Sequence, residues 1–282
     1  ASPQHPESIA AYATWAAAAV KHFHGRHIIW EIWNEPNGFF WKPKPDAEQY
    51  SALAVAAGKA IREADPRATL IGPALSGFQP PYMETFLKSG VLRYLDAVSV
   101  HPYRSAKKWP ETAEGDYQKL REKIEQYGQT EKQKKMPIIS GEWGYSTKIG
   151  DVSPETQAAY IVRQQLFNLL NGVPLSIWYD WKNDGTDPRE VEHNFGTVTD
   201  ELEPKPAYEA IKVMTHELEG YRIKKRLETD KNDFVLLCSK PFAKDKIVAW
   251  TTGYVHNTTT LITKGKGTQI ELGQMPKYLT LK

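Results

Sequence analysis

The stretch HIIWEIWNEPNGFFW, residues 27–41, decides the fold of this chain. Its first half is apolar and rich in β-branched residues, which predicts a buried strand over residues 27–34. The strand ends at Asn34 and Glu35, and a second carboxylate, Glu31, lies inside the apolar run. Two acids around one strand tip need an explanation, because buried carboxylates are costly without partners.

Strands and helices alternate along residues 1–220. Each predicted strand is a short apolar run, as expected for burial on both faces of a parallel sheet. The βα order therefore predicts an α/β sheet or barrel. Strands are expected at 27–34, 68–75, 94–103, 136–146 and 173–184, and helices at 8–23, 46–64, 81–90, 114–134, 153–172 and 205–220.

The pattern changes after Gly220. Residues 221–282 contain short alternating runs separated by turn residues, which is typical of antiparallel strands. We expect a small C-terminal β-sandwich-like domain there, beside a main domain of residues 1–220. It either packs against the main domain or binds carbohydrate, and we favour packing.

Composition narrows the function. The 36 Lys and Arg nearly balance the 34 Asp and Glu, so no nucleic-acid partner is implied. No apolar run approaches the ~20 residues of a membrane span. The single Cys238 excludes an intramolecular disulfide framework. The 9 Trp and 14 Tyr are a modest indication of flat, amphipathic ligands such as sugars. No cofactor is implied.

Several later strands also end in polar or aromatic residues. These ends are residues 101–103, 142–143 and 178–180, with the sequences HPY, EW and WYD. In a parallel α/β barrel the carboxyl ends of the strands share one face, where active sites lie. We therefore expect these residues to meet Asn34 and Glu35 at one mouth.

Two of these motifs resemble clan A of the glycoside hydrolases. WNEPN ends one strand, and GEWGYS (141–146) ends a strand three βα units later. The nearest likenesses are the cellulase-like family five and the β-xylosidase-like family thirty-nine, and the likeness runs over residues 27–214. It implies a (β/α)8 TIM barrel and a retaining mechanism, with the acid/base on strand four and the nucleophile on strand seven.

The spacing of the acids separates their roles. Glu31 and Glu35 are four residues apart, which is about 13 Å along an extended strand. Glycoside hydrolysis needs two carboxyl groups roughly 5–5.5 Å apart for retention, or about 6.5–9.5 Å for inversion. Glu31 is therefore expected to be structural, with a basic or hydrogen-bonding partner. Glu142 is the candidate partner of Glu35.

The resemblance gives roles to the strand-end residues. Glu35 matches the general acid/base and Glu142 the nucleophile, because one carboxylic acid protonates the leaving oxygen while an ionised carboxylate attacks the anomeric carbon. Asn34 matches the residue that binds the 2-hydroxyl of the sugar. Tyr103 matches a phenol that contacts the nucleophile.

Further residues are candidates for contact with the sugar. His101 matches a polar lining residue, although it could be a satisfied buried histidine. Trp178 matches the aromatic floor under the sugar, or else belongs to the core. Trp41 and Trp143, with Phe39 and Phe40, are either further sugar platforms or loop packing.

The acidic run around Asp180 and Asp184 borders the expected cleft and could contact hydroxyl groups. Such runs also bind Ca²⁺, but no EF-hand ligand register is present, so no metal site is predicted.

The strand count does not reach eight. The resemblance places the first strand of this chain at barrel strand four, so strands one to three have no counterpart in it. We expect a fragment of a longer protein. The alternatives are that the first strands come from a separate chain or another copy, or that the barrel is naturally partial. The family also suggests a secreted or periplasmic location.

These expectations converge on a retaining β-glycosidase that acts on a β-linked glucan. Xylan, mannan or a xyloside are alternative substrates. A non-catalytic carbohydrate-binding protein or an inactive barrel fragment is the alternative from another class.

Overall fold

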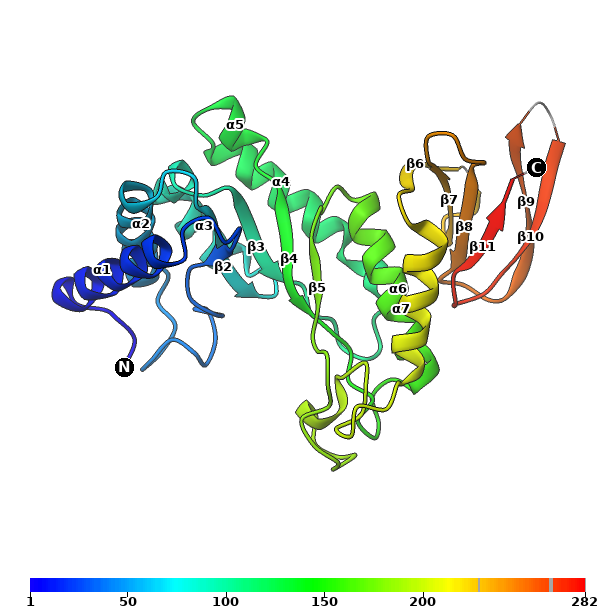
Figure 1. Ribbon diagram of the computed structural model, residues 1–282, viewed down its shortest axis with the longest axis horizontal. Coiled ribbons are helices and arrows are strands. Elements are labelled where there is room, and N and C mark those ends of the chain that lie inside the picture. Colours follow the sequence, from blue (N-terminus) through cyan, green and yellow to red (C-terminus); the bar gives the residue numbers. More distant parts are fainter. Residues whose placement is uncertain (228, 264–265, 282) are drawn as a thin grey trace. The chain divides into compact units, whose positions relative to one another are not determined.

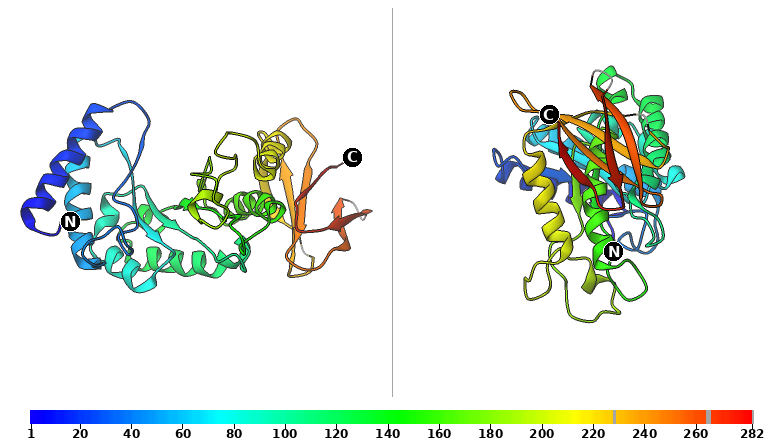
Figure 2. Two further views of the ribbon diagram at one scale, coloured as in Figure 1. Left: turned by 90° about the horizontal axis from the view of Figure 1, so that it is seen from below. Right: turned by 90° about the vertical axis from the view of Figure 1, so that its right-hand side faces the viewer.

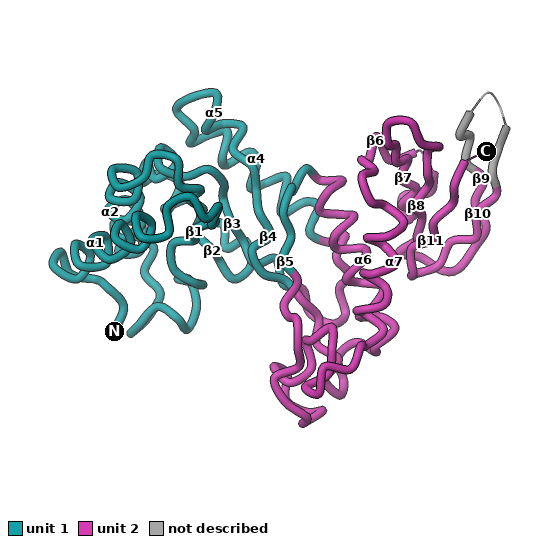
Figure 3. Tube along the Cα trace, viewed as in Figure 1, with its two compact units in different colours: residues 1–103, 113–143, 172–177 teal, residues 104–112, 144–171, 178–282 magenta. Residues whose placement is uncertain are grey.

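The computed structural model describes residues 1–227, 229–263 and 266–281. It divides into two compact units, shown in Figure 3. Unit 1 comprises Ala1–Tyr103, Ala113–Trp143 and Gly172–Ile177, and unit 2 comprises Arg104–Thr112, Gly144–Asn171 and Trp178–Lys282. This division does not follow the boundary expected at residue 220, because unit 2 joins helical segments to the C-terminal strands.

A parallel sheet forms the centre of unit 1 (Figure 1). Its strands follow one another in chain order, and neighbours from β1 to β4 pair in parallel. The inner strands β2 and β3 are almost wholly buried, whereas the outer strands β1 and β5 keep exposed residues. The architecture is that of a partial barrel. The strands are β1 (Ile29–Glu31), β2 (Thr69–Ser76), β3 (Ala97–His101), β4 (Ile138–Trp143) and β5 (Ser176–Trp178).

The first strand is shorter than the predicted 27–34, because the backbone leaves the extended region before the Asn-Glu pair. Trp33 has φ 66° and Glu35 has φ 42°, both in the left-handed region that non-glycine residues rarely adopt. The segment nevertheless stays attached to β2, since the Glu35 backbone N–H donates to the Ala74 carbonyl at 3.0 Å. Such strained positions gather at functional sites.

Helices α1 to α4 pack in sequence along the sheet of unit 1, and Figures 1 and 2 show α1 and α2 side by side. The helix predicted over 114–134 is divided. A Cβ at Gly128 would lie 2.6 Å from the Lys134 backbone nitrogen, so the chain turns there at a residue without a side chain. The helices are α1 (Pro6–His22), α2 (Ala47–Ala64), α3 (Pro80–Lys88), η1 (Val91–Arg93), α4 (Glu114–Tyr127) and α5 (Glu131–Lys134).

Unit 2 contains two antiparallel sheets. The larger sheet has the order β11-β8-β7-β6, and β9 and β10 form a hairpin. The strands are β6 (Arg222–Arg226), β7 (Asp233–Ser239), β8 (Lys246–Thr251), β9 (His256–Thr263), β10 (Lys266–Leu272) and β11 (Lys277–Thr280). The remaining elements are η2 (Pro110–Ala113), which crosses from unit 2 into unit 1, α6 (Pro154–Leu170), η3 (Glu192–Asn194) and α7 (Pro206–Leu218).

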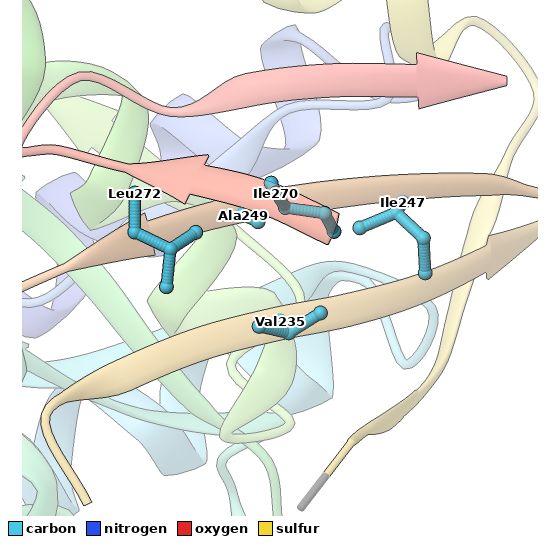
Figure 4. Packing of buried hydrophobic residues seen from close by; sticks show 5 residues of the cluster. All are labelled: Val235, Ile247, Ala249, Ile270 and Leu272. Carbon is cyan, nitrogen blue, oxygen red and sulfur yellow. The ribbon is translucent and has the colours of Figure 1, made fainter. Parts of the chain in front are cut away.

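The two antiparallel sheets share a hydrophobic core, shown in Figure 4. Val235 comes from β7, Ile247 and Ala249 from β8, and Ile270 and Leu272 from β10. Each of these side chains is buried, which removes apolar surface of both sheets from water. The packing agrees with the sandwich-like arrangement expected from the alternating pattern.

A buried ion pair joins separate segments of unit 2. The Arg163 guanidinium on α6 donates twice to the Glu111 carboxylate, from Nε at 2.7 Å and from Nη2 at 2.6 Å. Trp250 on β8 donates its indole N–H to Glu111 Oε1 at 2.6 Å. All three residues are buried, so the pair is screened from water and its loss leaves a charge uncompensated.

Within the described ranges, no helix combines the length and the apolar character needed to cross a bilayer.

Candidate active site

Three polar side chains from neighbouring strand ends meet in unit 1. Glu35 follows β1, His101 ends β3, and Glu142 lies near the end of β4. His101 Nδ1 is 3.0 Å from Glu35 Oε1 and 3.8 Å from Glu142 Oε2. The His101 side chain is 1% exposed, against 16% for Glu35 and 27% for Glu142, so water reaches both acids while the ring is enclosed.

Tyr103 contacts the second of these acids. Its hydroxyl donates to Glu142 Oε1 at 2.7 Å. The backbone between His101 and Tyr103 is tightly turned, because the Tyr103 N–H donates to the His101 carbonyl at 2.8 Å. A hydrogen bond from a neutral hydroxyl fixes the orientation of the carboxylate that accepts it.

The turn that carries Glu35 is held on β2 by Asn37, a residue that the sequence did not single out. Its side-chain amide donates to the Ser76 carbonyl at 2.8 Å, and its side-chain oxygen accepts from the Ser76 N–H at 3.0 Å. Tyr82 donates its hydroxyl to the Pro36 carbonyl at 3.1 Å. Asparagine side chains commonly form hydrogen bonds with the backbone in turns. The position of Asn37 at the end of the Asn-Glu-Pro-Asn run could therefore have indicated this role.

Glu31 lies closer to this group than the sequence indicated. The estimate of about 13 Å between Glu31 and Glu35 assumed an extended backbone, and the left-handed residues Trp33 and Glu35 invalidate that assumption. Burial raises the pKa of Glu31, while a hydrogen bond from Ser99 and the nearby His101 lower it. By surface area Glu31 is exposed, so its carboxyl group is surrounded by protein on one side and open to solvent on the other.

Two tryptophans expected as sugar platforms are not available as such. Trp41 and Trp143 are both completely buried, so neither offers a face of its indole ring to a ligand. Their large apolar surfaces belong to the core of unit 1 instead. Phe39 and Phe40, in contrast, are 77% and 50% exposed, and Asn34 is also exposed.

Trp178 falls in unit 2, at the boundary between the two units. It is partly buried, its ring lies 6.4 Å from that of Tyr145, and its indole N–H donates to the Phe195 carbonyl at 3.4 Å. Its role as the floor under a sugar therefore stays a prediction.

Two charged residues in and near the acidic run that follows Trp178 have shifted pKa values. Burial raises the pKa of Asp180 to about 6, with the nearby Asp184 and Glu192 adding to the shift. Burial also lowers the pKa of Lys205 to about 8, and Asp180 opposes that change. Tyr179 donates its hydroxyl to Glu192 Oε2 at 2.9 Å. The contact of Asp180 and Asp184 with sugar hydroxyls stays a prediction.

One cluster among the described residues has the donor atoms for a metal ion. Glu35, His101 and Glu142 each offer one ligand atom, and these atoms lie within 4.8 Å of one another. The same two carboxylates are the groups that a glycoside hydrolase uses on its substrate, so the cluster does not by itself indicate a metal centre.

Comparison with known proteins places this geometry in a family. The family model for Cellulase (glycosyl hydrolase family 5) matches residues 1–185. A β-xylosidase from Caldicellulosiruptor saccharolyticus is 26% identical over 222 residues, which is 72% of this chain and 44% of that protein. A β-xylosidase from Geobacillus stearothermophilus is 34% identical over 113 residues, which is 36% of this chain and 22% of that protein.

Solved structures give the same picture. A family 39 glycoside hydrolase from the gut symbiont Bacteroides cellulosilyticus WH2 superimposes with a TM-score of 0.83 and 25% identity, over 99% of this chain and 63% of that one. A family 39 β-xylosidase from Caulobacter crescentus has a TM-score of 0.63 and 23% identity, over 88% of this chain and 55% of that one.

The chain thus spans less than half the length of the curated relatives and under two thirds of the Bacteroides enzyme. The matched family model nevertheless extends over most of its residues and includes both Glu35 and Glu142. The chain therefore belongs to the Cellulase family (glycosyl hydrolase family 5), among the clan A glycoside hydrolases that also include its family 39 neighbours.

Proposed function

We propose that the protein is a retaining β-glycoside hydrolase, with Glu35 as general acid/base and Glu142 as nucleophile. One observation carries the proposal: a carboxylate oxygen of Glu35 and one of Glu142 lie within 4.8 Å of each other. Retaining enzymes hold these groups roughly 5–5.5 Å apart, and inverting enzymes about 6.5–9.5 Å apart to admit a water molecule. The short separation favours retention.

The reaction then has two steps. The protonated Glu35 gives its proton to the glycosidic oxygen while the Glu142 carboxylate attacks the anomeric carbon, which breaks the glycosidic bond and forms a glycosyl ester. Glu35, now ionised, takes a proton from water, and that water displaces Glu142 from the anomeric carbon. The two inversions restore the β configuration.

The neighbouring residues support these two roles. The Tyr103 hydroxyl, 2.7 Å from Glu142 Oε1, orients the carboxylate for attack. His101, whose Nδ1 lies 3.0 Å from Glu35 Oε1, holds the acid/base within reach of the glycosidic bond. Asn34 would donate to the 2-hydroxyl of the sugar, and Trp178 would stack under the ring.

A β-linked xyloside is the substrate class that we favour over the β-glucan expected from the motifs. The curated relatives are described as β-xylosidases, and the family 39 structures include another. The match to the cellulase model keeps a β-glucan as the second candidate. A panel of 4-nitrophenyl β-xyloside, β-glucoside and β-mannoside, with the matching oligosaccharides, decides between them.

We also propose that β1 to β5 are strands four to eight of an eight-stranded barrel. The exposed Ile29 on β1 and Ile177 on β5 are consistent with outer strands that accept further strands. Those strands would come from a longer form of the polypeptide or from another chain. Activity should therefore be measured on the longest product of the gene and on residues 1–282 in parallel. A secreted or periplasmic location also stays a prediction.

Azide rescue tests the two catalytic roles separately. Glu35→Ala and Glu142→Ala should each lose about 10²–10⁴-fold in kcat on an activated aryl β-xyloside. Azide should restore Glu142→Ala and give the α-glycosyl azide, because azide then attacks the anomeric carbon in place of the carboxylate. In Glu35→Ala it should give the β-glycosyl azide, because it replaces water in the second step.

Glu48→Ala, an exposed acid on α2, serves as the matched control and should keep wild-type rates. If Glu142→Ala hydrolyses the aryl glycosides at the wild-type rate, the assignment is wrong. If the wild-type protein binds xylo-oligosaccharides in calorimetry but turns none over, it is a carbohydrate-binding protein instead.

A further inference from the structure

A third carboxyl group, that of Glu31, lies near the catalytic group beside Gly141. A methyl group added at Gly141 would be 3.2 Å from Glu31 Oε1 and 3.6 Å from Glu31 Oε2. The same point is 3.5 Å from His101 Nε2. The Glu31 carboxyl group and the Nε2 edge of the His101 ring thus occupy the space beside Gly141. Gly141 is the residue directly before Glu142 in the chain. Glycine at this position leaves room for both.

The two nitrogen atoms of His101 thus face different groups. Nδ1 lies 3.0 Å from Glu35 Oε1, while Nε2 and the Glu31 carboxyl group both face the point beside Gly141. The charge of Glu31 interacts with the ring that contacts Glu35.

The surroundings of Glu31 couple it to the same site. Burial raises its pKa most, and the Glu142 carboxylate raises it further, whereas the Ser99 hydroxyl and His101 lower it. Tyr50 on α2 is a further neighbour, which is buried and whose own pKa is raised partly by Glu31. Glu31 repels Glu142 and attracts His101, so a change in its charge reaches both.

We propose that Glu31 is a positioning residue of the catalytic centre, which acts through its charge on His101 and Glu142 from beside Gly141 and sets the pH range of the catalytic pair. The proposal rests on the retaining mechanism proposed above. It replaces the purely structural role expected for Glu31 from its place in the strand. Ser99, which also accepts from the Ala74 N–H at 2.9 Å, anchors the carboxyl group to β2 and β3.

Glu31→Gln removes the charge and keeps the shape of the side chain. We expect kcat on an aryl β-xyloside to fall about tenfold, as for other partners that orient a reacting group, with KM nearly unchanged. The acid limb of the kcat/KM profile should move to lower pH, because one negative charge near the catalytic pair is removed. Glu31→Asp keeps the charge on a shorter stem, so its acid limb should stay at the wild-type pH while kcat falls.

Glu48→Gln is the control for loss of one carboxylate elsewhere in unit 1, and it should leave both limbs unchanged. If Glu31→Gln lowers thermal stability but leaves the limbs and kcat as in the wild type, Glu31 is only structural and the proposal is overturned. The same holds if Glu31→Asp shifts the acid limb as far as Glu31→Gln.

A second measurement does not depend on turnover. Carbon NMR of labelled glutamate follows the titration of Glu31 directly in the wild type and in His101→Asn. Loss of the attractive ring should raise the pKa of Glu31 further, even in a protein without hydrolytic activity. An identical Glu31 titration in both proteins would contradict the coupling, whereas absent hydrolysis alone would contradict only the proposed function.

Discussion

At the scale of single residues, the hydrogen bond from Tyr103 to Glu142 is the most accessible test. Tyr103→Phe removes a donor to a charged acceptor, which is worth about 1.5–3 kcal/mol, or roughly 10- to 100-fold in kcat. Steady-state kinetics on an aryl β-xyloside measures the loss. Tyr127→Phe is the matched control, because Tyr127 donates to Glu84 Oε1 at the same 2.7 Å away from the site. Equal values of kcat for both variants would show that Tyr103 does not contribute to catalysis.

Phe39 and Phe40 give a second prediction at this scale. Both side chains are exposed, their rings are 5.9 Å apart, and the loop is fixed by the bond from Trp33 Nε1 to the Phe40 carbonyl at 3.3 Å. If the pair stacks on the leaving part of the substrate, Phe39→Ala should raise KM for xylo-oligosaccharides about 2- to 10-fold, from the worth of an aromatic contact. KM for a glycosyl fluoride, which lacks that part, should not change. An equal rise for both substrates would exclude the platform.

Sequence reasoning succeeded in predicting which residues lie together where their position depends on strand order. Glu35, His101, Tyr103 and Glu142 lie together because parallel strands deliver their carboxyl ends to one edge, and this follows from the βα pattern. Sequence reasoning failed where tertiary packing determines whether a side chain is buried. The burial of Trp41 is not encoded in any local pattern, since an indole serves a core and a sugar platform equally well.

At the scale of elements, the segment after β5 is expected to make the stability of the protein depend on pH. The folded-state pKa of Asp180, about 6, lies above the ~3.9 of an unfolded aspartate, so the folded protein binds this proton more tightly. Stability from this group is then greatest at low pH and falls as the pH rises through that window. Asp180→Asn should raise the melting temperature at pH 7 and make no difference near pH 4.

Differential scanning calorimetry at both pH values checks this expectation. Asp200→Asn, in the same segment, controls for the change in net charge. A gain of equal size at pH 4 and pH 7 would show that the effect does not come from the titration of Asp180.

The element boundaries show the limits of local patterns. The predicted helix over 114–134 is interrupted at Gly128, which the helical periodicity of its neighbours did not reveal. Gly128 was one local indication, because a residue without Cβ permits the close approach of the Lys134 backbone. The other was Thr130 with Gln133 three residues later, which form a capping box at the start of α5. The early end of β1 has a similar cause, since left-handed conformations at Trp33 and Glu35 are fixed by tertiary contacts rather than by propensity.

At the scale of the whole molecule, the buried group of Glu111, Arg163 and Trp250 is expected to stabilise unit 2. Glu111→Gln leaves the Arg163 guanidinium buried without its counter-charge, which should lower the free energy of unfolding by about 3–5 kcal/mol. Trp250→Phe removes one donor to that carboxylate and should cost about 1.5–3 kcal/mol. Urea unfolding measures both.

The double variant Glu111→Gln, Arg163→Met should recover part of the loss, because it removes the unpaired charge as well. Glu63→Gln is the control: its ion pair with Lys59 is exposed, and the change should stay below about 1 kcal/mol. If Glu111→Gln costs no more than this control, the buried pair does not stabilise the unit.

The interleaving of the two units along the chain bears on how the protein is made (Figure 3). Unit 1 lacks its last strand residues until Ile177 has been synthesised, and by then Arg104–Thr112 and Gly144–Asn171 of unit 2 have already been synthesised. Glu111 must then wait for Trp250, 139 positions later, before its third partner exists. Domains usually fold one after another as they emerge. Here two segments of unit 2 are synthesised before the last strand of unit 1, so the two units cannot fold strictly in the order of the chain.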